Sequence, residues 1–196
     1  TTPRECVKDG KSAVRWIRLH AAQFGIDPNR VAAGGGSAGG HVAAATGTVE
    51  RFEEAGEDLT VSSRPNALVL FNPVFDNGPD GYGFERVKEY WEKFSPRHNI
   101  SEQTPPTIVF LGTEDKHVPV ETAKKYKQIM LEKNRQCDLH LYEGQPHGFF
   151  NVGNAEFYKK TVFEMDRFLE SLGYLEGEPT IDLGEMEPGP ARSPAD

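Results

Sequence analysis

Two hydrophobic patterns alternate along most of the chain. The first is a short apolar run bounded by turn residues, which is typical of a strand buried in a parallel sheet. The second places apolar residues three or four positions apart, which is typical of an amphipathic helix. The predicted strands are residues 30–33, 67–71, 107–111 and 137–142. The predicted helices are residues 9–24, 38–47, 85–94, 120–132 and 155–172.

The spacing also predicts which face of each helix is buried. The inward residues of the first helix would be Ala13, Val14, Ile17, Ala21 and Phe24, with Arg15, Arg18 and His20 on the other face. Those of the helix at 120–132 would be Ala123, Tyr126, Ile129 and Met130. Those of the last helix would be Tyr158, Val162, Met165, Leu169 and Leu172.

Strands that alternate with helices predict one α/β domain, which we assign to residues 1–178, with a mostly parallel sheet and helices on both faces. Residues 50–64 show no apolar face and are expected to be a solvated excursion. Residues 75–104 form a long connection, and such connections usually serve as the lid or wall of a binding site. Five aromatic residues there either line an apolar pocket or pack the short helix onto the body: Tyr82, Phe84, Tyr90, Trp91 and Phe94.

Composition and charge restrict the partners. The chain has 196 residues and a formal net charge of −8, which argues against nucleic acid, and no apolar run approaches the length needed to cross a membrane. Much of the negative charge lies near the C-terminus, so residues 179–196 are expected to form an acidic, disordered tail. Cys6 and Cys137 are expected to be free thiols, with a single disulfide as the alternative, and no residues are spaced as a metal site.

The candidate chemistry begins at Gly35-x-Ser37-x-Gly39, where a predicted strand turns into a predicted helix. This spacing is that of a nucleophile elbow, in which a serine takes a strained conformation and glycines leave room for the crossing of strand and helix. The N–H of Ala38 and the positive end of the helix dipole would face an oxyanion formed beside Ser37. Glycine-rich turns of this kind also bind phosphates, so the motif alone does not decide the function.

Two later loops supply the groups that a serine nucleophile needs. The hydroxyl requires a base, and the base requires a carboxylate that fixes its tautomer. His147 follows the fourth predicted strand, and Asp115, which we prefer to Glu114 and Asp138, follows the third. Because ligands bind at the carboxyl ends of parallel strands, we expect Ser37, Asp115 and His147 to converge there as a catalytic triad. Their order along the chain is the order found in α/β-hydrolases.

Three segments, GGSAGGH at 35–41, LGTEDKHVP at 111–119 and QPHGF at 145–149, resemble the catalytic segments of α/β-hydrolase esterases and lipases. Within that superfamily the chain is similar to the carboxylesterase branch that includes hormone-sensitive-lipase-like and feruloyl or acetylxylan esterase-like enzymes. Gly36, where the hormone-sensitive-lipase group usually has an acid, favours the feruloyl-esterase-like group. The resemblance implies ester hydrolysis without a cofactor. We add four candidate substrate contacts: Gly36, Phe75, Val118 and Phe149.

One part of the family pattern is absent. The resemblance implies an upstream His-Gly-Gly segment that supplies further oxyanion donors, and residues 1–36 contain none. The sequence also starts at Thr1 with neither an initiator Met nor a signal peptide. We therefore expect an N-terminally incomplete α/β-hydrolase fold, an oxyanion hole impaired by the lack of donors other than Ala38, and an open sheet edge that could pair in a homodimer.

These observations favour a serine carboxylester hydrolase that forms an acyl-enzyme and acts on short-chain acyl or small aromatic esters. One alternative is a prolyl-oligopeptidase-like serine peptidase, whose elbow is similar. Such peptidases usually carry a propeller or another gating domain, and nothing in these 196 residues could form one. The other alternative is a non-catalytic hydrolase remnant that keeps the triad without using it.

Overall fold

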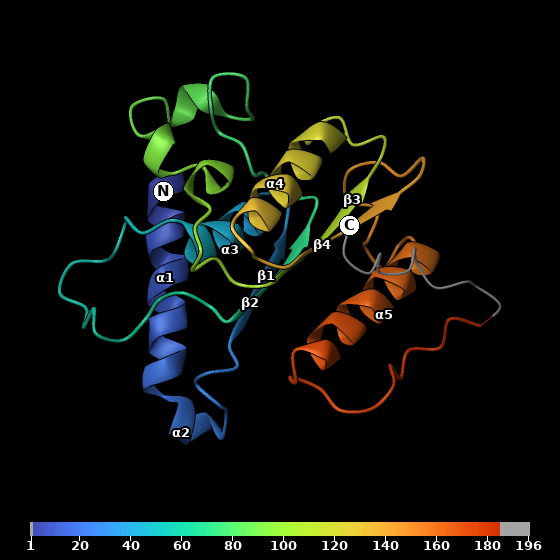
Figure 1. Ribbon diagram of the computed structural model, residues 1–196, viewed down its shortest axis with the longest axis horizontal. Coiled ribbons are helices and arrows are strands. Elements are labelled where there is room, and N and C mark those ends of the chain that lie inside the picture. The colour runs from blue at the N-terminus through green and yellow to red at the C-terminus, as the bar shows by residue number, and fades with distance from the viewer. Residues whose placement is uncertain (1, 185–196) are drawn as a thin grey trace.

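The four strands of the described residues form one parallel sheet in the order β1-β2-β3-β4 (Figure 1). The structure is a computed structural model and describes residues 2–184, so most of the expected tail at 179–196 lies outside the described residues. The strands are β1 Ala32–Gly36, β2 Ala67–Phe71, β3 Thr107–Gly112 and β4 Cys137–Tyr142. The α-helices are α1 Pro3–Leu19, α2 Ala21–Phe24, α3 Ala38–Thr48, α4 Val120–Glu132 and α5 Ala155–Ser171.

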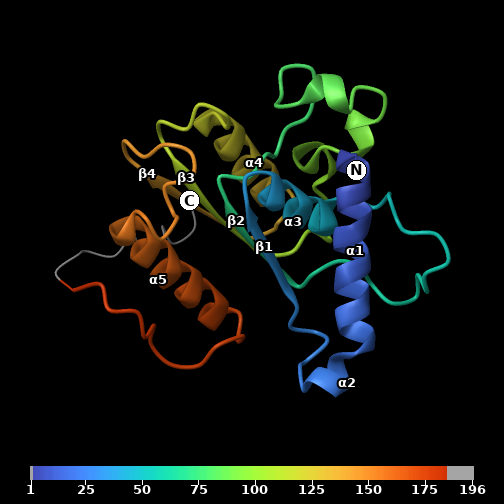
Figure 2. The same ribbon diagram turned by 180° about the vertical axis from the view of Figure 1, so that it is seen from behind.

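Alternate residues of the central strands face two different helical layers. Leu68 and Leu70 pack with α3 and α4 in one cluster, whereas Ala67 and Val69 pack with Phe168 of α5 in another. Figures 1 and 2 show α3 and α4 on one side of the sheet and α5 on the other. Both faces are therefore covered, which explains the unbroken apolar runs and confirms the predicted parallel sheet.

The expectation that the first strand is buried is wrong. Within the described residues β1 lies at the edge of the sheet, beside β2 alone, and Ala32 and Gly34 are exposed. The strand also extends through the three glycines that precede Ser37, and each of these glycines pairs in parallel register with a residue of β2.

The buried face of α1 also differs from the prediction. The helix starts at Pro3, where Thr2 accepts a hydrogen bond from the Glu5 N–H as an N-cap, rather than near Asp9. It packs against α3 so closely that a Cβ added at Gly10 would lie 2.7 Å from Val42 Cγ1. This contact sets the inward face, which includes Val7, Lys11, Val14 and Arg15. Ala13 and Phe24, both predicted inward, are exposed.

In α5 the most deeply buried stripe lies one position before the predicted one. Thr161, Glu164 and Phe168 are buried, whereas Tyr158 is exposed. The predicted residues Met165 and Leu169 are partly buried at the side of the same cluster. The error arose because the predicted apolar stripe marks the border of the contact with the sheet, whereas the centre combines Phe168 with two polar residues, Thr161 and Glu164.

Residues 50–64 are mostly exposed, as expected for a solvated excursion. The segment has no helix or strand, but it is held by the buried cations of α1. Glu53 accepts hydrogen bonds from Lys11 Nζ at 2.7 Å and from Arg15 Nη2 at 2.8 Å, and Arg15 also pairs with Glu57. Burial alone would raise the pKa of the Glu53 carboxyl, but the hydrogen bonds from Lys11 and Arg15 lower the pKa below its usual value.

The long connection at 75–104 contains three 3₁₀ helices in place of the predicted helix at 85–94. They are η1 Phe84–Arg86, η2 Trp91–Lys93 and η3 Pro96–Asn99. Phe94 is buried against α3 and Tyr82 is 51% exposed, and both line one cavity. Both cysteines are free thiols, as predicted. None of the helices between residues 2 and 184 combines the length and apolar character needed to cross a membrane.

Replacing Glu53 with Gln is expected to lower the free energy of unfolding by about 2 kcal/mol at pH 7, because it leaves two buried cations with one carboxylate between them. The folded-state pKa of Glu53 is depressed, so its contribution is present above the usual value of 4.5 and is lost as the pH falls through the folded-state pKa. Urea unfolding at pH 7 and at pH 4 measures both effects.

The matched control is Glu121→Gln, which removes an exposed pair with Lys124 and should cost less than about 0.5 kcal/mol. Equal free energies of unfolding for the Glu53 and Glu121 variants at pH 7 would contradict the conclusion that Glu53 holds residues 50–64 to α1.

Candidate active site

Ser37 occupies a strained turn between β1 and α3. Its backbone has φ 54° and ψ −116°, a positive φ that residues with a Cβ rarely adopt. The crossing of strand and helix is tight, because a Cβ added at Gly35 would lie 2.6 Å from the carbonyl carbon of Gly39. On the far side, a Cβ at Gly40 would lie 2.8 Å from Pro73 Cβ. These glycines let α3 start directly behind the serine.

His147 joins Ser37 to Asp115. Its Nε2 lies 2.9 Å from Ser37 Oγ, and its Nδ1 lies 2.7 Å from Asp115 Oδ2. The Asp115 side chain is fully buried, whereas that of His147 is 24% exposed. The structure thus brings together three side chains from the ends of β1, β3 and β4, in the geometry of a nucleophile, a base and an orienting carboxylate.

Backbone donors orient the Asp115 carboxylate. Its Oδ1 accepts hydrogen bonds from the N–H groups of His117 at 2.8 Å and Val118 at 2.9 Å, which leaves Oδ2 for His147. The acid loop is tied to the histidine loop by the Glu114 N–H, which donates to the Gln145 carbonyl at 3.0 Å. A Cβ at Gly112 would lie 2.1 Å from that carbonyl oxygen, so only glycine fits there.

Asn72 is part of this site, although the sequence patterns indicated only a strand stop. It follows β2, is fully buried and has φ 34°. Its Oδ1 accepts the N–H of Gly148 at 2.8 Å, and its Nδ2 lies 3.3 Å from His147 Nε2. A polar residue at the carboxyl end of a buried parallel strand was the signal that could have identified it.

The candidate substrate contacts lie in different surroundings. Phe75 is 1% exposed and stacks on Tyr126, and with Val118 it lines a cavity of about 200 Å³. The space beside Gly36 is filled by the ring of Phe150, because a Cβ there would lie 2.6 Å from its Cζ. Phe149 is 3% exposed in the cluster against α5, so its burial does not support the expected substrate contact.

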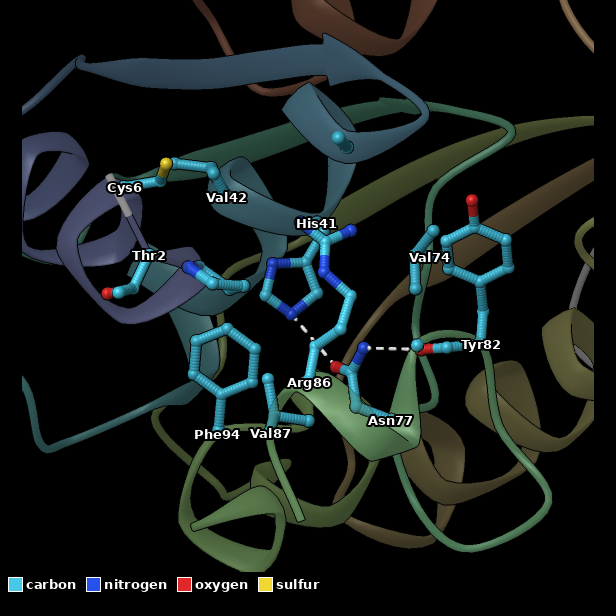
Figure 3. Close-up of a pocket in the computed structure, with 13 residues that line it drawn as sticks. Thr2, Cys6, His41, Val42, Val74, Asn77, Tyr82, Arg86, Val87 and Phe94 are labelled. Carbon is cyan, nitrogen blue, oxygen red and sulfur yellow. Dashed lines mark hydrogen bonds between the residues drawn. The ribbon is translucent and has the colours of Figure 1, made fainter. Parts of the chain in front are cut away.

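A second cavity, of about 190 Å³, opens beside the elbow (Figure 3). Ala38 lines it, and its N–H belongs to the first helical turn, whose donors have no acceptor within the helix. Apolar side chains form most of the wall, among them Val42, Val74, Val87 and Phe94. Ala38 follows Ser37 directly in the chain, so the cavity opens at the first turn of α3, next to the serine.

His41 forms the polar part of the same wall. Its Nε2 lies 2.9 Å from Asn77 Oδ1, and Asn77 Nδ2 donates to the Tyr82 carbonyl at 3.0 Å (Figure 3). Burial lowers the pKa of His41 to about 4, against the opposing effect of the bond to Asn77. His41 is therefore neutral near pH 7 and fixes Asn77. Within residues 2–184, His, Cys, Asp and Glu side chains form no group of three or more that could hold a metal ion.

Comparisons with known proteins relate the chain to one family and to proteins named as esterases. The family model described as the prolyl oligopeptidase family matches residues 3–172. The chain is 30% identical over 167 residues to a probable isoprenylcysteine alpha-carbonyl methylesterase of Arabidopsis thaliana, covering 73% of this chain and 35% of that protein. It is 28% identical over 185 residues to an acetylxylan esterase of Xylanibacter ruminicola, covering 85% and 35%.

Among solved structures, the apo form of Thermogutta terrifontis esterase 2 superposes with a TM-score of 0.86 at 42% identity. The match covers 91% of this chain and 69% of that one. The chain thus spans about a third of the length of these two curated relatives and about two thirds of the solved esterase chain.

Asn72→Gly is expected to slow the reaction of Ser37 with a fluorophosphonate by about 10-fold, because it removes the side chain that holds the histidine loop. Glycine adopts the positive φ of this position without strain, so the backbone should keep its conformation. The measurement is the labelling rate by intact mass at several pH values. Asn134→Gly is the matched control, because Asn134 also has a positive φ but lies in the turn between α4 and β4. Equal rates for the two variants would show that Asn72 does not position the base.

Proposed function

The chain belongs to the prolyl oligopeptidase family of α/β-hydrolases, and from this premise we propose that it is a serine carboxylester hydrolase. The observation that carries the proposal is the continuous hydrogen-bonded chain from Ser37 through His147 to Asp115, with distances of 2.9 and 2.7 Å. The relatives named above are esterases and support the same class of reaction.

In this proposal Ser37 Oγ attacks the ester carbonyl while His147 Nε2 takes its proton. Asp115 stabilises the resulting imidazolium through Nδ1, and the N–H of Ala38 donates to the oxyanion. Collapse of the tetrahedral intermediate expels the alcohol, which receives the proton from His147 and leaves an acyl group on Ser37. His147 then activates water to hydrolyse this acyl-enzyme, and the acid is released.

We propose short acyl chains or small aromatic acids as the acyl part. The cavity beside Ala38 is only about 190 Å³ and its wall is mostly apolar, so it has room for a few carbon atoms. Thermogutta terrifontis esterase 2, one of the similar structures, is described in forms bound to propionate and to butyrate. Both acids have the size that this cavity would accept.

A serine peptidase is the second candidate, because the matching family model carries the name of a peptidase family. We prefer the esterase because the three relatives described above, two curated proteins and one solved structure, all carry the name of an esterase. A non-catalytic remnant is the third candidate, and the hydrogen-bonded geometry of Ser37 speaks against it. The alternatives predict different results for one set of measurements.

The purified chain is expected to be labelled once by a fluorophosphonate, at Ser37, and to hydrolyse 4-nitrophenyl butyrate but not a prolyl 4-nitroanilide. Ser37→Ala should abolish both reactions, and Asp115→Asn should lower kcat by about 10⁴-fold because the histidine loses its orienting carboxylate. Ser101→Ala, in the connection at 75–104, is the control serine variant.

Labelling without turnover of any ester would support the remnant, and faster cleavage of the anilide than of the ester would support the peptidase. Intact-mass analysis identifies the labelled residue in each case.

Turnover of 4-nitrophenyl acetate is expected to be slow. Among the described residues we assign the N–H of Ala38 as the oxyanion donor and no second one. The loss of one donor from such a site costs on the order of 100- to 1,000-fold in kcat. The measurement is kcat for the chain beside that of Thermogutta terrifontis esterase 2 under the same conditions. Equal values would contradict the impaired oxyanion hole.

A further inference from the structure

The cavity beside Ala38 has one unusual feature, which is the charge of Arg86. Figure 3 draws the 13 residues that line this cavity, and among these described residues Arg86 alone carries a formal charge near pH 7. The other walls are mainly apolar, with Val42, Val74 and Phe94 close to the elbow helix. Arg86 is exposed at the rim of the cavity, where its guanidinium can form charge-assisted hydrogen bonds with a bound anion.

Within residues 2–184, no carboxylate forms an ion pair with Arg86. Its neighbour Lys88, by contrast, pairs with Glu85 at 3.2 Å. In Figure 3 the Arg86 side chain extends from η1 across the cavity and passes in front of His41. Its guanidinium donors thus point into the space beside the elbow, where they are available to a bound molecule.

The other polar groups of the wall are already engaged. Asn77 bonds to His41 and to the Tyr82 carbonyl, and burial keeps His41 neutral near pH 7 by lowering its pKa. Neither side chain adds a charge to the cavity. The preference of the cavity for charged or neutral molecules therefore depends on Arg86.

The cavity on the other side of Val74 and Tyr82 has the opposite character. It is lined by Asp80 and Asp76, of which Asp76 is paired with Arg97 at 2.6 Å. An anionic group would be repelled by the exposed Asp80 carboxylate there and attracted by Arg86 in the cavity beside Ala38. An anionic substrate would thus bind more favourably in the cavity beside Ala38 than in the cavity beside Asp80.

We propose that Arg86 is a specificity residue that binds a carboxylate carried by the ester substrate, so that the chain prefers anionic esters to neutral ones of the same size. This inference rests on the proposed esterase function. The carboxylate could belong to the acyl part, as in a half-ester of a dicarboxylic acid, or to the alcohol part, as in an acylated hydroxybenzoate. Both sources share one chemistry, which is a carboxylate that accepts hydrogen bonds from a guanidinium.

The test compares kcat/KM for two matched pairs of esters. Mono-4-nitrophenyl adipate and 4-nitrophenyl hexanoate differ by a carboxylate on the acyl side, and the butyryl esters of 4-hydroxybenzoate and of its methyl ester differ on the alcohol side. For at least one pair, Arg86→Gln is expected to lower the ratio of anionic to neutral kcat/KM by about 5- to 10-fold, mainly through KM. Arg86→Lys should keep part of the ratio because it keeps the charge.

Lys88→Gln is the matched control, since it removes a nearby positive charge that does not line the cavity. Its ratios should equal those of the parent chain. Ratios that stay constant in Arg86→Gln for both pairs, or that fall equally in Lys88→Gln, would overturn the proposal. Hydrolysis of the neutral esters that is lost in Ser37→Ala supports the esterase function separately, so the two ideas can fail independently.

Discussion

The close crossing of β1 and α3 at the elbow is the constraint on which the site depends. Strand and helix approach until a Cβ at Gly35 would overlap the backbone of Gly39, and the chain makes this turn with Ser37 at φ 54°. That conformation presents the hydroxyl at the carboxyl edge of the sheet, where Asp115 and His147 also arrive. Within the elbow turn the strain lies at Ser37, and the packing of β1 and α3 against β2 supports it.

Loops that leave the same edge are locked to one another rather than to the sheet alone. The loop after β2 holds the loop after β4, since Asn72 accepts the Gly148 N–H. The loop after β4 in turn holds the loop after β3, since the Gln145 carbonyl accepts the Glu114 N–H. The histidine is thus fixed from two sides, which is the preorganisation that a general base needs.

Sequence patterns predicted the strands β2, β3 and β4, the helix α4 and the three residues that meet at the site, because apolar runs and loop order are local signals. They failed where a contact between distant segments decides the outcome. Arg15 was assigned to solvent, yet it is buried because Glu53 and Glu57 neutralise it, and no helical periodicity encodes such partners. Asn72 was missed because its role depends on Gly148, which lies 76 positions away.

Two histidines lie near the nucleophile, and their surroundings assign them different tasks. His41 is enclosed beside Phe94, and burial lowers its pKa to about 4, so near pH 7 its ring stays neutral. It serves to hold Asn77 and the wall of the cavity. His147 lies instead between a hydroxyl and a buried carboxylate, and in the proposed mechanism this carboxylate would stabilise the imidazolium formed when His147 takes a proton. In the proposed mechanism the protein thus separates the imidazole that shapes the cavity wall from the imidazole that would move protons, although both lie near the same turn.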